Sequence, residues 1–360
     1  MPGPGPCTKT AAGTAVEDLT ARGVITPDWA EAFRAVRRAD YVPDRIWDLD
    51  NTLVDRATDP DAWERLVDDD APLVTHRADD GTPLSSSSMP YMVATMLRHL
   101  APEPGDRVLE IGTGTGWNAA LLCHRLGDQA VTTVDVDPGI CADAEAALKA
   151  AGYRPHVVCA DGAAGHPDGE TVQRLIATCT VQTIPYPWVQ QTRGRIVTPF
   201  GHGTSAGGLL VLESDGRTAT GRIVDTSAFM WLRAQQPTAW TTGTTGDDTT
   251  TTLDPRLLVA DVHERFTLGL RVPNCRYSLA WGSGDEADEC TLWLSDGTSW
   301  ASADSIPGRD RHDVTQSGPR RLWDEAEAAY GWWVDRGRPD ITRFGVTVDG
   351  HGQRAWLDHP

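Results

Sequence analysis

A glycine-rich turn between an apolar strand pattern and a helix pattern is the strongest chemical signal in the chain. The strand pattern covers 107–111, the helix pattern begins at Trp117, and alternate positions between them are glycine. Glycine is needed where the backbone adopts angles that side chains resist and where a ligand approaches the main chain closely. The pattern therefore predicts a ligand-binding turn, called the glycine turn below, formed by Gly112, Thr113, Gly114 and Gly116.

The residues around the glycine turn bear on the charge of its ligand. A dinucleotide favours the spacing GxGxxG, but Trp117 stands where the third glycine would fall. Glu110, just before the turn, would repel a diphosphate and attract a cationic ligand. S-adenosyl-L-methionine fits because it carries a sulfonium and an ammonium group and no phosphate. A tight turn without any ligand is the remaining alternative.

Two more carboxylates follow the next two strand patterns. Asp135 ends the pattern over 130–134, at the position where an acid can accept hydrogen bonds from both ribose hydroxyls. Asp161 and Gly162 follow the pattern over 156–159 and could meet an adenine amino group. Each aspartate alone is typical of a solvated turn. Together with Glu110 and the glycine turn they favour an S-adenosyl cofactor, with S-adenosyl-L-homocysteine as its product.

Helix and strand patterns alternate around these residues, which predicts an α/β fold. The alternation indicates a Rossmann-like, doubly wound sheet that is mostly parallel, with ligands at the carboxyl ends of its strands. We expect this domain to cover 89–234. Its helix patterns are 91–100, 117–126 and 140–151, and its strand patterns are 107–111, 130–134, 156–159, 174–178 and 195–199.

Four further segments complete the predicted organisation. Residues 1–15 lack the features of a signal peptide and are expected to form a disordered tail, and 16–88 an N-terminal helical cap. The segment 235–252 is rich in Thr, Gly and Asp and is expected to be a linker. Beyond it we predict a small α+β C-terminal accessory domain over 253–360, with a helix over 320–335.

Composition excludes several classes of protein. The 360 residues carry a formal net charge of −19, whereas proteins that coat nucleic acid or anionic membranes are usually basic. Apolar runs are too short to span a bilayer, so we expect a cytoplasmic protein without a membrane or nucleic-acid partner. The seven cysteines form no CxxC pair and the ten histidines no ligand spacing, which predicts no metal site. We expect a monomer, although the sequence leaves the oligomeric state open.

Linked segments between positions 34 and 233 resemble the protein-L-isoaspartate O-methyltransferase family. They include the family's amino-terminal signature, its Ser-x-Pro substrate segment, its first cofactor motif, its adenine motif and its closing strands. The resemblance implies a class I S-adenosylmethionine-dependent enzyme that methylates a carboxylate in a peptide. The matching segments are 36–43, 88–93, 108–121, 159–162, 184–185, 194–201 and 229–233.

The resemblance also implies which residues receive the peptide. Ser88 would be the hydroxyl that orients the acceptor carboxylate. An aspartyl carboxylate is already ionised at neutral pH, so no general base is needed and catalysis would depend on alignment and charge matching. The implied substrate-binding residues are Ser85, Ser86, Ser87, Ser88, Met89, Gly201 and His202.

The chain departs from the repair enzymes of this family in two places. The serine segment, Ser85–Ser88, and Met89 replace the residues usual there, and the chain continues far beyond position 233. A serine run is also typical of a flexible linker. The layout resembles an actinobacterial subgroup that acts on ribosomal peptides cross-linked by ATP-grasp ligases (graspetides). This implies methylation of an ordinary aspartate in a macrocyclic precursor peptide, whose ester then closes to an aspartimide. General isoaspartyl repair and a non-catalytic, cofactor-binding scaffold are the alternatives.

Overall fold

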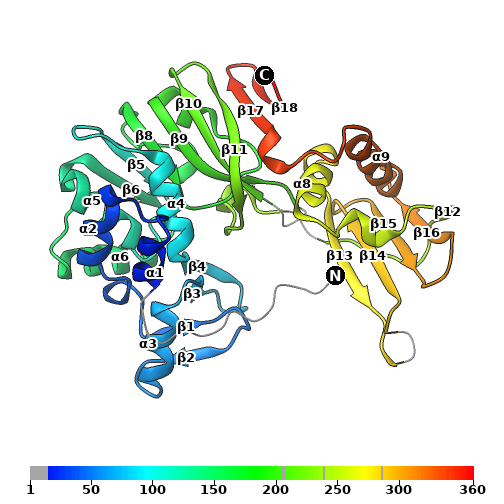
Figure 1. The fold of residues 1–360 in the computed structure, drawn as a ribbon, viewed down its shortest axis with the longest axis horizontal. Coiled ribbons are helices and arrows are strands. Elements are labelled where there is room, and N and C mark those ends of the chain that lie inside the picture. Colours follow the sequence, from blue (N-terminus) through cyan, green and yellow to red (C-terminus); the bar gives the residue numbers. More distant parts are fainter. Residues whose placement is uncertain (1–14, 204–206, 238–239, 285–286) are drawn as a thin grey trace. The chain divides into compact units, whose positions relative to one another are not determined.

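The computed structural model describes residues 15–203, 207–237, 240–284 and 287–360, which fall into two compact units (Figure 1). The first unit is Met1–Gly162 and the second is Ala163–Pro360. The tail predicted over 1–15 lies outside the described residues, apart from Ala15. No helix in the described part of the chain is long and apolar enough to cross a membrane.

The N-terminal part of the first unit is only partly the helical cap that was predicted over 16–88. A four-stranded antiparallel sheet in the order β2-β1-β3-β4 accompanies the helices. Its strands are three to five residues long, too short to show a clear alternating pattern. The elements are α1 (Ala15–Ala21), α2 (Pro27–Ala35), η1 (Arg38–Asp40), β1 (Arg45–Trp47), β2 (Leu53–Asp55), α3 (Pro60–Asp68), β3 (Leu73–Arg77) and β4 (Pro83–Ser87).

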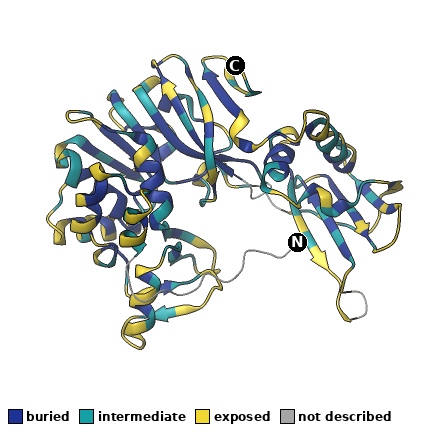
Figure 2. Ribbon diagram, viewed as in Figure 1, coloured by how far each residue is buried: buried dark blue, intermediate teal, exposed yellow. Residues whose placement is uncertain are grey.

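The remainder of the first unit contains three parallel strands and three helices, within two residues of their predicted bounds. Every residue of β5 is buried (Figure 2), as expected for a strand covered on both faces. Because the strands are parallel, their carboxyl ends lie at one edge. The elements are α4 (Pro90–Leu100), β5 (Val108–Ile111), α5 (Trp117–Leu126), η2 (Asp128–Ala130), β6 (Val131–Asp135), α6 (Pro138–Ala150), β7 (His156–Cys159) and η3 (Gly162–Ala164).

The first strands of the second unit form a sheet, and the last two strands of the chain extend this sheet. The order is β8-β9-β10-β11-β17-β18, with β8 parallel to β9 and the other pairs antiparallel. The C-terminal strands thus belong to this sheet and not to a separate domain over 253–360 as predicted. The elements are β8 (Val172–Ala177), α7 (Tyr186–Gln191), β9 (Thr192–Gly201), β10 (Gly207–Ser214), β11 (Ala219–Ser227), η4 (Arg233–Gln235), η7 (Ile341–Arg343), β17 (Phe344–Asp349) and β18 (Gly352–Leu357).

A five-stranded antiparallel sheet, ordered β12-β16-β15-β14-β13, completes the second unit. It shares an apolar core with α9 that includes Leu292, Leu294 and Trp323. Strand β12 lies inside the predicted linker, because its β-branched threonines pair with β16 once that strand is present. The elements are β12 (Asp247–Thr251), η5 (Pro255–Leu258), α8 (Val262–Arg271), β13 (Arg276–Trp281), β14 (Cys290–Ser295), β15 (Trp300–Ser305), β16 (His312–Ser317) and α9 (Leu322–Asp335).

Candidate functional site

The glycine turn has the backbone conformation that its sequence predicts. Gly112, Gly114 and Gly116 have φ angles of 96°, 53° and 83°, in the region that side chains disfavour. The Gly116 N–H donates to the Thr113 carbonyl oxygen at 2.9 Å, which closes the turn. A Cβ on Gly116 would also lie 3.2 Å from Leu148 Cγ. The backbone therefore favours glycine at all three positions, and a side chain at Gly116 would also require Leu148 to shift.

Glu110 lies beneath the glycine turn and is fully buried. Its Oε1 accepts from Asn118 Nδ2 at 2.6 Å, and its Oε2 accepts from Thr133 Oγ1 at 2.5 Å. The Thr133 hydroxyl is in turn 2.7 Å from the Thr113 hydroxyl. Burial raises the pKa of Glu110 to about 7. Glu110 thus supports the turn from inside, and its predicted part in attracting a cationic ligand stays a prediction.

Asp135 connects the end of β6 to the glycine turn. Its Oδ2 accepts from the Gly114 N–H at 3.2 Å, and its Oδ1 accepts from the Asp137 N–H at the same distance. Its carbonyl oxygen accepts from the Ala160 N–H at 2.9 Å, just beyond β7. The side chain is half-buried. Asp135 therefore lies beside the glycine turn, and its predicted contact with ribose hydroxyls stays a prediction.

Asp161 and Gly162 lie at the corresponding end of β7. Asp161 is exposed and Gly162 is buried. A Cβ on Gly162 would come within 2.5 Å of Ile111 Cγ2, at the end of β5, so that only glycine fits there. The carboxyl ends of β5, β6 and β7 therefore bring the glycine turn, Asp135 and Gly162 to one edge.

This edge has a chemical character that suits an S-adenosyl group. Asp135 and Asp161 supply carboxylates, which accept hydrogen bonds from hydroxyl and amino groups. The glycine turn supplies a close main-chain approach without any Cβ at three of its positions. None of these residues is basic, whereas a diphosphate site usually offers cationic side chains.

The serine segment forms most of β4 and packs against the glycine turn. A Cβ on Gly114 would lie 3.5 Å from the Ser86 carbonyl oxygen and 3.6 Å from Ser85 Oγ. Ser85 and Ser87 are buried, while Ser86 and Ser88 are half-buried. The segment is thus an ordered strand paired with β3, and the flexible-linker interpretation is wrong. Ser88 follows β4 directly, and Met89 is the N-cap residue of α4.

Arg38 holds the serine segment, although it was not among the predicted site residues. Its guanidinium is buried and donates to Ser87 Oγ at 3.0 Å and to the Ser87 carbonyl oxygen at 2.9 Å. It also donates to three carbonyl oxygens of the segment 67–71. Burial lowers the pKa of Arg38 to about 10, so it stays charged at neutral pH. Its place in the signature-like segment 36–43 was the available signal.

Gly201 and His202 lie at the end of β9 in the second unit. The Gly201 N–H donates to the Val181 carbonyl oxygen at 3.1 Å. The His202 ring is buried and packs edge-on against Phe200, with ring centroids 5.4 Å apart. Burial lowers the pKa of His202 to about 4, so the imidazole is neutral at physiological pH. The side chain is thus part of the packed interior of this unit.

Comparisons with known proteins agree on one family. Its model, described as protein-L-isoaspartate(D-aspartate) O-methyltransferase, matches residues 12–230. The protein-L-isoaspartate O-methyltransferase of Korarchaeum cryptofilum is 31% identical over 234 residues, which is 61% of this chain and 96% of the relative. Protein-L-isoaspartate O-methyltransferase 2 of Anaeromyxobacter sp. is 33% identical over 188 residues, 51% of this chain and 67% of the relative.

A solved structure gives the same result for the fold. A chain described as a protein-L-isoaspartate O-methyltransferase superposes with a TM-score of 0.53 and 18% identity, covering 96% of this chain and 98% of that one. The predicted class I methyltransferase fold, an α/β arrangement with a mixed sheet, is confirmed. The family match ends at residue 230, and the residues that follow are called the C-terminal extension below.

Proposed function

The chain belongs to the protein-L-isoaspartate(D-aspartate) O-methyltransferase family, and on this basis we propose that it methylates an aspartate side chain in a cyclised ribosomal peptide. Membership makes it a carboxyl O-methyltransferase that depends on S-adenosyl-L-methionine. The identity of the acceptor, an ordinary aspartate in a macrocycle, is the proposal.

We assign the cofactor to the edge formed by β5, β6 and β7. The cofactor, when bound, supplies an electrophilic methyl group on its sulfonium. Asp135 and Asp161 would accept hydrogen bonds from its ribose and adenine groups. The glycine turn would admit its amino-acid part, with Thr113 held in place through Thr133 and Glu110. Gly162 allows β7 to end close against Ile111 of β5, which keeps Asp161 beside the glycine turn's strand.

The observation that carries the proposal is the contact between the serine segment and the glycine turn. It places the segment assigned to the acceptor against the turn assigned to the donor, within one unit. Ser88 would direct one oxygen of the acceptor carboxylate and leave the other free to attack. The carboxylate is ionised at neutral pH, so the reaction requires alignment and not proton removal. For Gly201 and His202, a part in binding the acceptor peptide remains what the family resemblance implies.

The fate of the ester distinguishes this proposal from repair. The carboxylate oxygen bonds to the methyl carbon as the sulfur–methyl bond breaks. The following backbone nitrogen of the peptide then attacks the ester carbonyl carbon, and methanol leaves with the nitrogen's proton, so that an aspartimide remains. The ester is needed because a carboxylate is a poor electrophile. A cyclised peptide would lose less conformational entropy on binding than a linear one.

Two features of the chain favour a specialised acceptor. The serine segment differs from the sequence usual in repair enzymes, and the C-terminal extension adds two strands to the sheet that contains β9. Repair of damaged proteins is the second candidate, because family membership supports it equally. A scaffold without catalytic activity is the third, and it predicts that Ser88→Ala leaves function intact.

Mass spectrometry of three synthetic peptides tests the proposal. The first is cyclised through side-chain esters and contains one Asp-Gly pair, the second is its linear form, and the third is linear with isoaspartate. With enzyme and cofactor, we expect the cyclic peptide to gain one methyl group and then to lose methanol. Methylation of the linear isoaspartyl peptide alone would establish repair instead. Transfer to none of the three would refute both catalytic candidates.

A further inference from the structure

A pocket of about 340 Å³ in the second unit combines residues of the family-matched region with residues of the C-terminal extension. Gln182, Thr183 and Gly203 come from the matched region, and Asn274 and the segment 235–237 come from the extension. Gly203 follows directly on Gly201 and His202, the residues assigned above to the acceptor side. The extension therefore enlarges this region with its own polar groups.

The described residues of the pocket lining are uncharged, and four of these seven residues carry carboxamides. Among them there is no basic side chain to pair with a phosphate and no carboxylate to pair with a cation. Carboxamides both donate and accept hydrogen bonds, as peptide groups do. The lining suits a neutral peptide main chain.

The wall of the pocket is held in place by two carboxamides that bind main chain. The Gln235 Oε1 accepts from the N–H groups of Gln182 and Thr183 at 2.8 and 2.9 Å, and its Nε2 donates to the Thr183 carbonyl oxygen at 2.7 Å. Gln353, in β18, donates to the Gln182 carbonyl oxygen at 3.0 Å and accepts from the Ile184 N–H at 2.8 Å. The loop 182–184 is thus fixed on both sides before any ligand binds.

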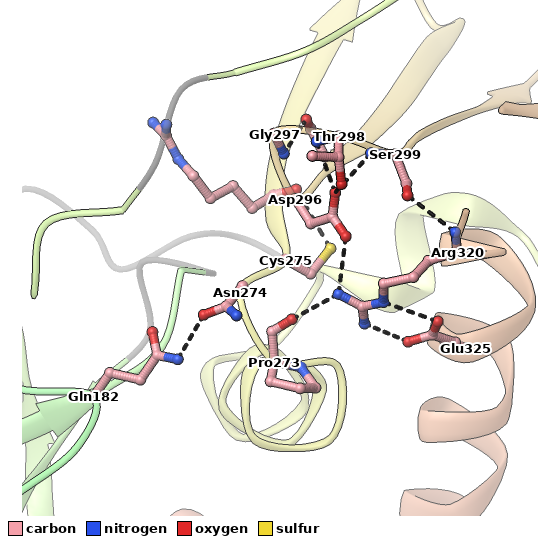
Figure 3. Close-up of polar contacts among 12 residues, drawn as sticks. Gln182, Pro273, Asn274, Cys275, Asp296, Gly297, Thr298, Ser299, Arg320 and Glu325 are labelled. Atoms are coloured by element: carbon pink, nitrogen blue, oxygen red, sulfur yellow. Dashed lines mark hydrogen bonds and ion pairs between the residues drawn. The ribbon is translucent and has the colours of Figure 1, made fainter. Parts of the chain in front are cut away.

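Gln182 and Asn274, which both line the pocket, are hydrogen-bonded to each other (Figure 3). Gln182 Nε2 donates to Asn274 Oδ1 at 2.8 Å. This hydrogen bond engages the nitrogen of one carboxamide and the oxygen of the other. Among the described residues, Gln182 Oε1 and Asn274 Nδ2 have no partner. The pair therefore offers one acceptor and one donor, which complement the N–H and the carbonyl oxygen of a peptide main chain.

The extension supports Asn274 from behind. Asn274 has a φ of 63°, a conformation that asparagine tolerates better than most residues. Arg320 donates to the carbonyl oxygen of the preceding Pro273 at 2.9 Å and forms an ion pair with Asp296 at 3.1 Å (Figure 3). The corner that carries Asn274 is thereby fixed, and the entropy cost of ordering it on binding is reduced.

We propose that this pocket binds a stretch of the main chain of the peptide substrate, with Gln182 accepting from a peptide N–H and Asn274 donating to a peptide carbonyl oxygen. The inference rests on the proposed function, because it takes the substrate to be a peptide. It gives the extension a direct part in substrate selection.

Calorimetry tests the pocket separately from catalysis. The enzyme is saturated with S-adenosyl-L-homocysteine, so that no transfer occurs, and titrated with the cyclic aspartyl and the linear isoaspartyl peptides described above. Asn274→Gly removes the carboxamide and keeps the backbone angle, and Gln182→Met removes the acceptor and keeps the shape. Each is expected to weaken peptide binding about tenfold, the value of roughly one hydrogen bond. Affinity for the homocysteine product should not change.

Asn51→Gly is the matched control. Asn51 has a φ of 65°, is exposed, and lies in the turn between β1 and β2, outside the pocket lining. We expect this variant to bind the peptides as the wild type does. The backbone nitrogens of the cyclic peptide are also N-methylated, one at a time. We expect one of these N-methyl groups to weaken binding to the wild type but not binding to Gln182→Met.

Three results would overturn the assignment: equal peptide affinity in wild type and both pocket variants, an N-methylation effect that persists in Gln182→Met, or no binding of either peptide to the wild type. The pocket variants and the N-methyl peptides report on binding, and mass spectrometry reports on transfer. Peptide binding with the expected pattern but without methyl transfer would support the pocket and refute the proposed function alone.

Discussion

Arg38 binds both the side chain and the main chain of Ser87, through its Nε at 3.0 Å and its Nη2 at 2.9 Å. The same guanidinium binds carbonyl oxygens at Val67, Asp69 and Ala71. A single buried cation thus holds the serine segment to the loop before β3. The position of the segment assigned to the acceptor depends on a residue that need not touch substrate.

Substitution of Arg38 should therefore disturb both stability and peptide binding. Arg38→Met leaves these carbonyl oxygens unpaired, and we expect it to lower the free energy of unfolding by at least about 1–3 kcal/mol, the cost of one buried acceptor without a partner. Arg38→Lys keeps the charge but not the forked geometry, so it should cost less and mainly raise KM for peptide. Urea denaturation and steady-state kinetics measure the two effects. Arg37 is exposed, and Arg37→Lys is the control. Equal free energies of unfolding and equal KM values for Arg38→Lys and Arg37→Lys would contradict the prediction.

Gly114→Ala should weaken cofactor binding. Its φ of 53° imposes a backbone cost of roughly 1–2 kcal/mol on alanine, and the new methyl group would touch the serine segment. Gly105→Ala has the same kind of backbone cost, at φ 94°, but meets no atom within 4 Å. We expect both variants to lose stability and only Gly114→Ala to lose affinity for S-adenosyl-L-homocysteine in calorimetry. If Gly114→Ala and Gly105→Ala bind S-adenosyl-L-homocysteine with equal affinity, the glycine turn is not part of the cofactor site.

From Glu110 we expect the free energy of unfolding to fall as the pH rises. Its pKa is about 7 in the folded state against about 4.5 in the unfolded chain, so between these values the folded state holds more protons. The contribution of Glu110 is complete below pH 4.5 and declines through pH 7, by roughly 3 kcal/mol in total. Glu110→Gln should abolish this part of the slope. Denaturation at pH 5 and pH 8, with exposed Glu103→Gln as control, measures it. An unchanged slope would contradict the assignment.

His202 predicts the opposite pH dependence of the free energy of unfolding, at acid pH. Its folded pKa of about 4 lies below the ordinary value of 6.5, so the unfolded chain takes up a proton first as the pH falls. Stability should therefore be lost between pH 6.5 and pH 4. The imidazole protons in an NMR titration should respond near pH 4, and exposed His359 serves as an internal reference. A His202 midpoint near 6.5 would show that the ring is solvated.

The sequence predicts the elements around the cofactor edge well and the added elements poorly. The helix at Trp117 and the strand at His156 have their predicted bounds, because glycines and apolar runs delimit them. Strands β17 and β18 were assigned to a separate domain, because their pairing with β11 joins residues far apart in the chain. Pairing at that distance leaves no trace in local periodicity.

The candidate site also has some features that the sequence predicts and others that it does not. The conformation of the glycine turn and the position of Asp135 follow from local spacing. Burial does not, and nothing in the spacing indicates that Glu110 lies in the interior. Arg38 was missed because four of its five hydrogen bonds go to main-chain carbonyl oxygens, which every residue possesses.

The pairing of β11 with β17 also has a consequence for how the chain is made. Ala219 pairs with Val348, so during synthesis β11 leaves the ribosome long before its partner exists. Until then β11 is an open sheet edge, which other nascent chains could join. Closing such a long loop is slow. Chaperone dependence during expression is therefore an expected property of this architecture.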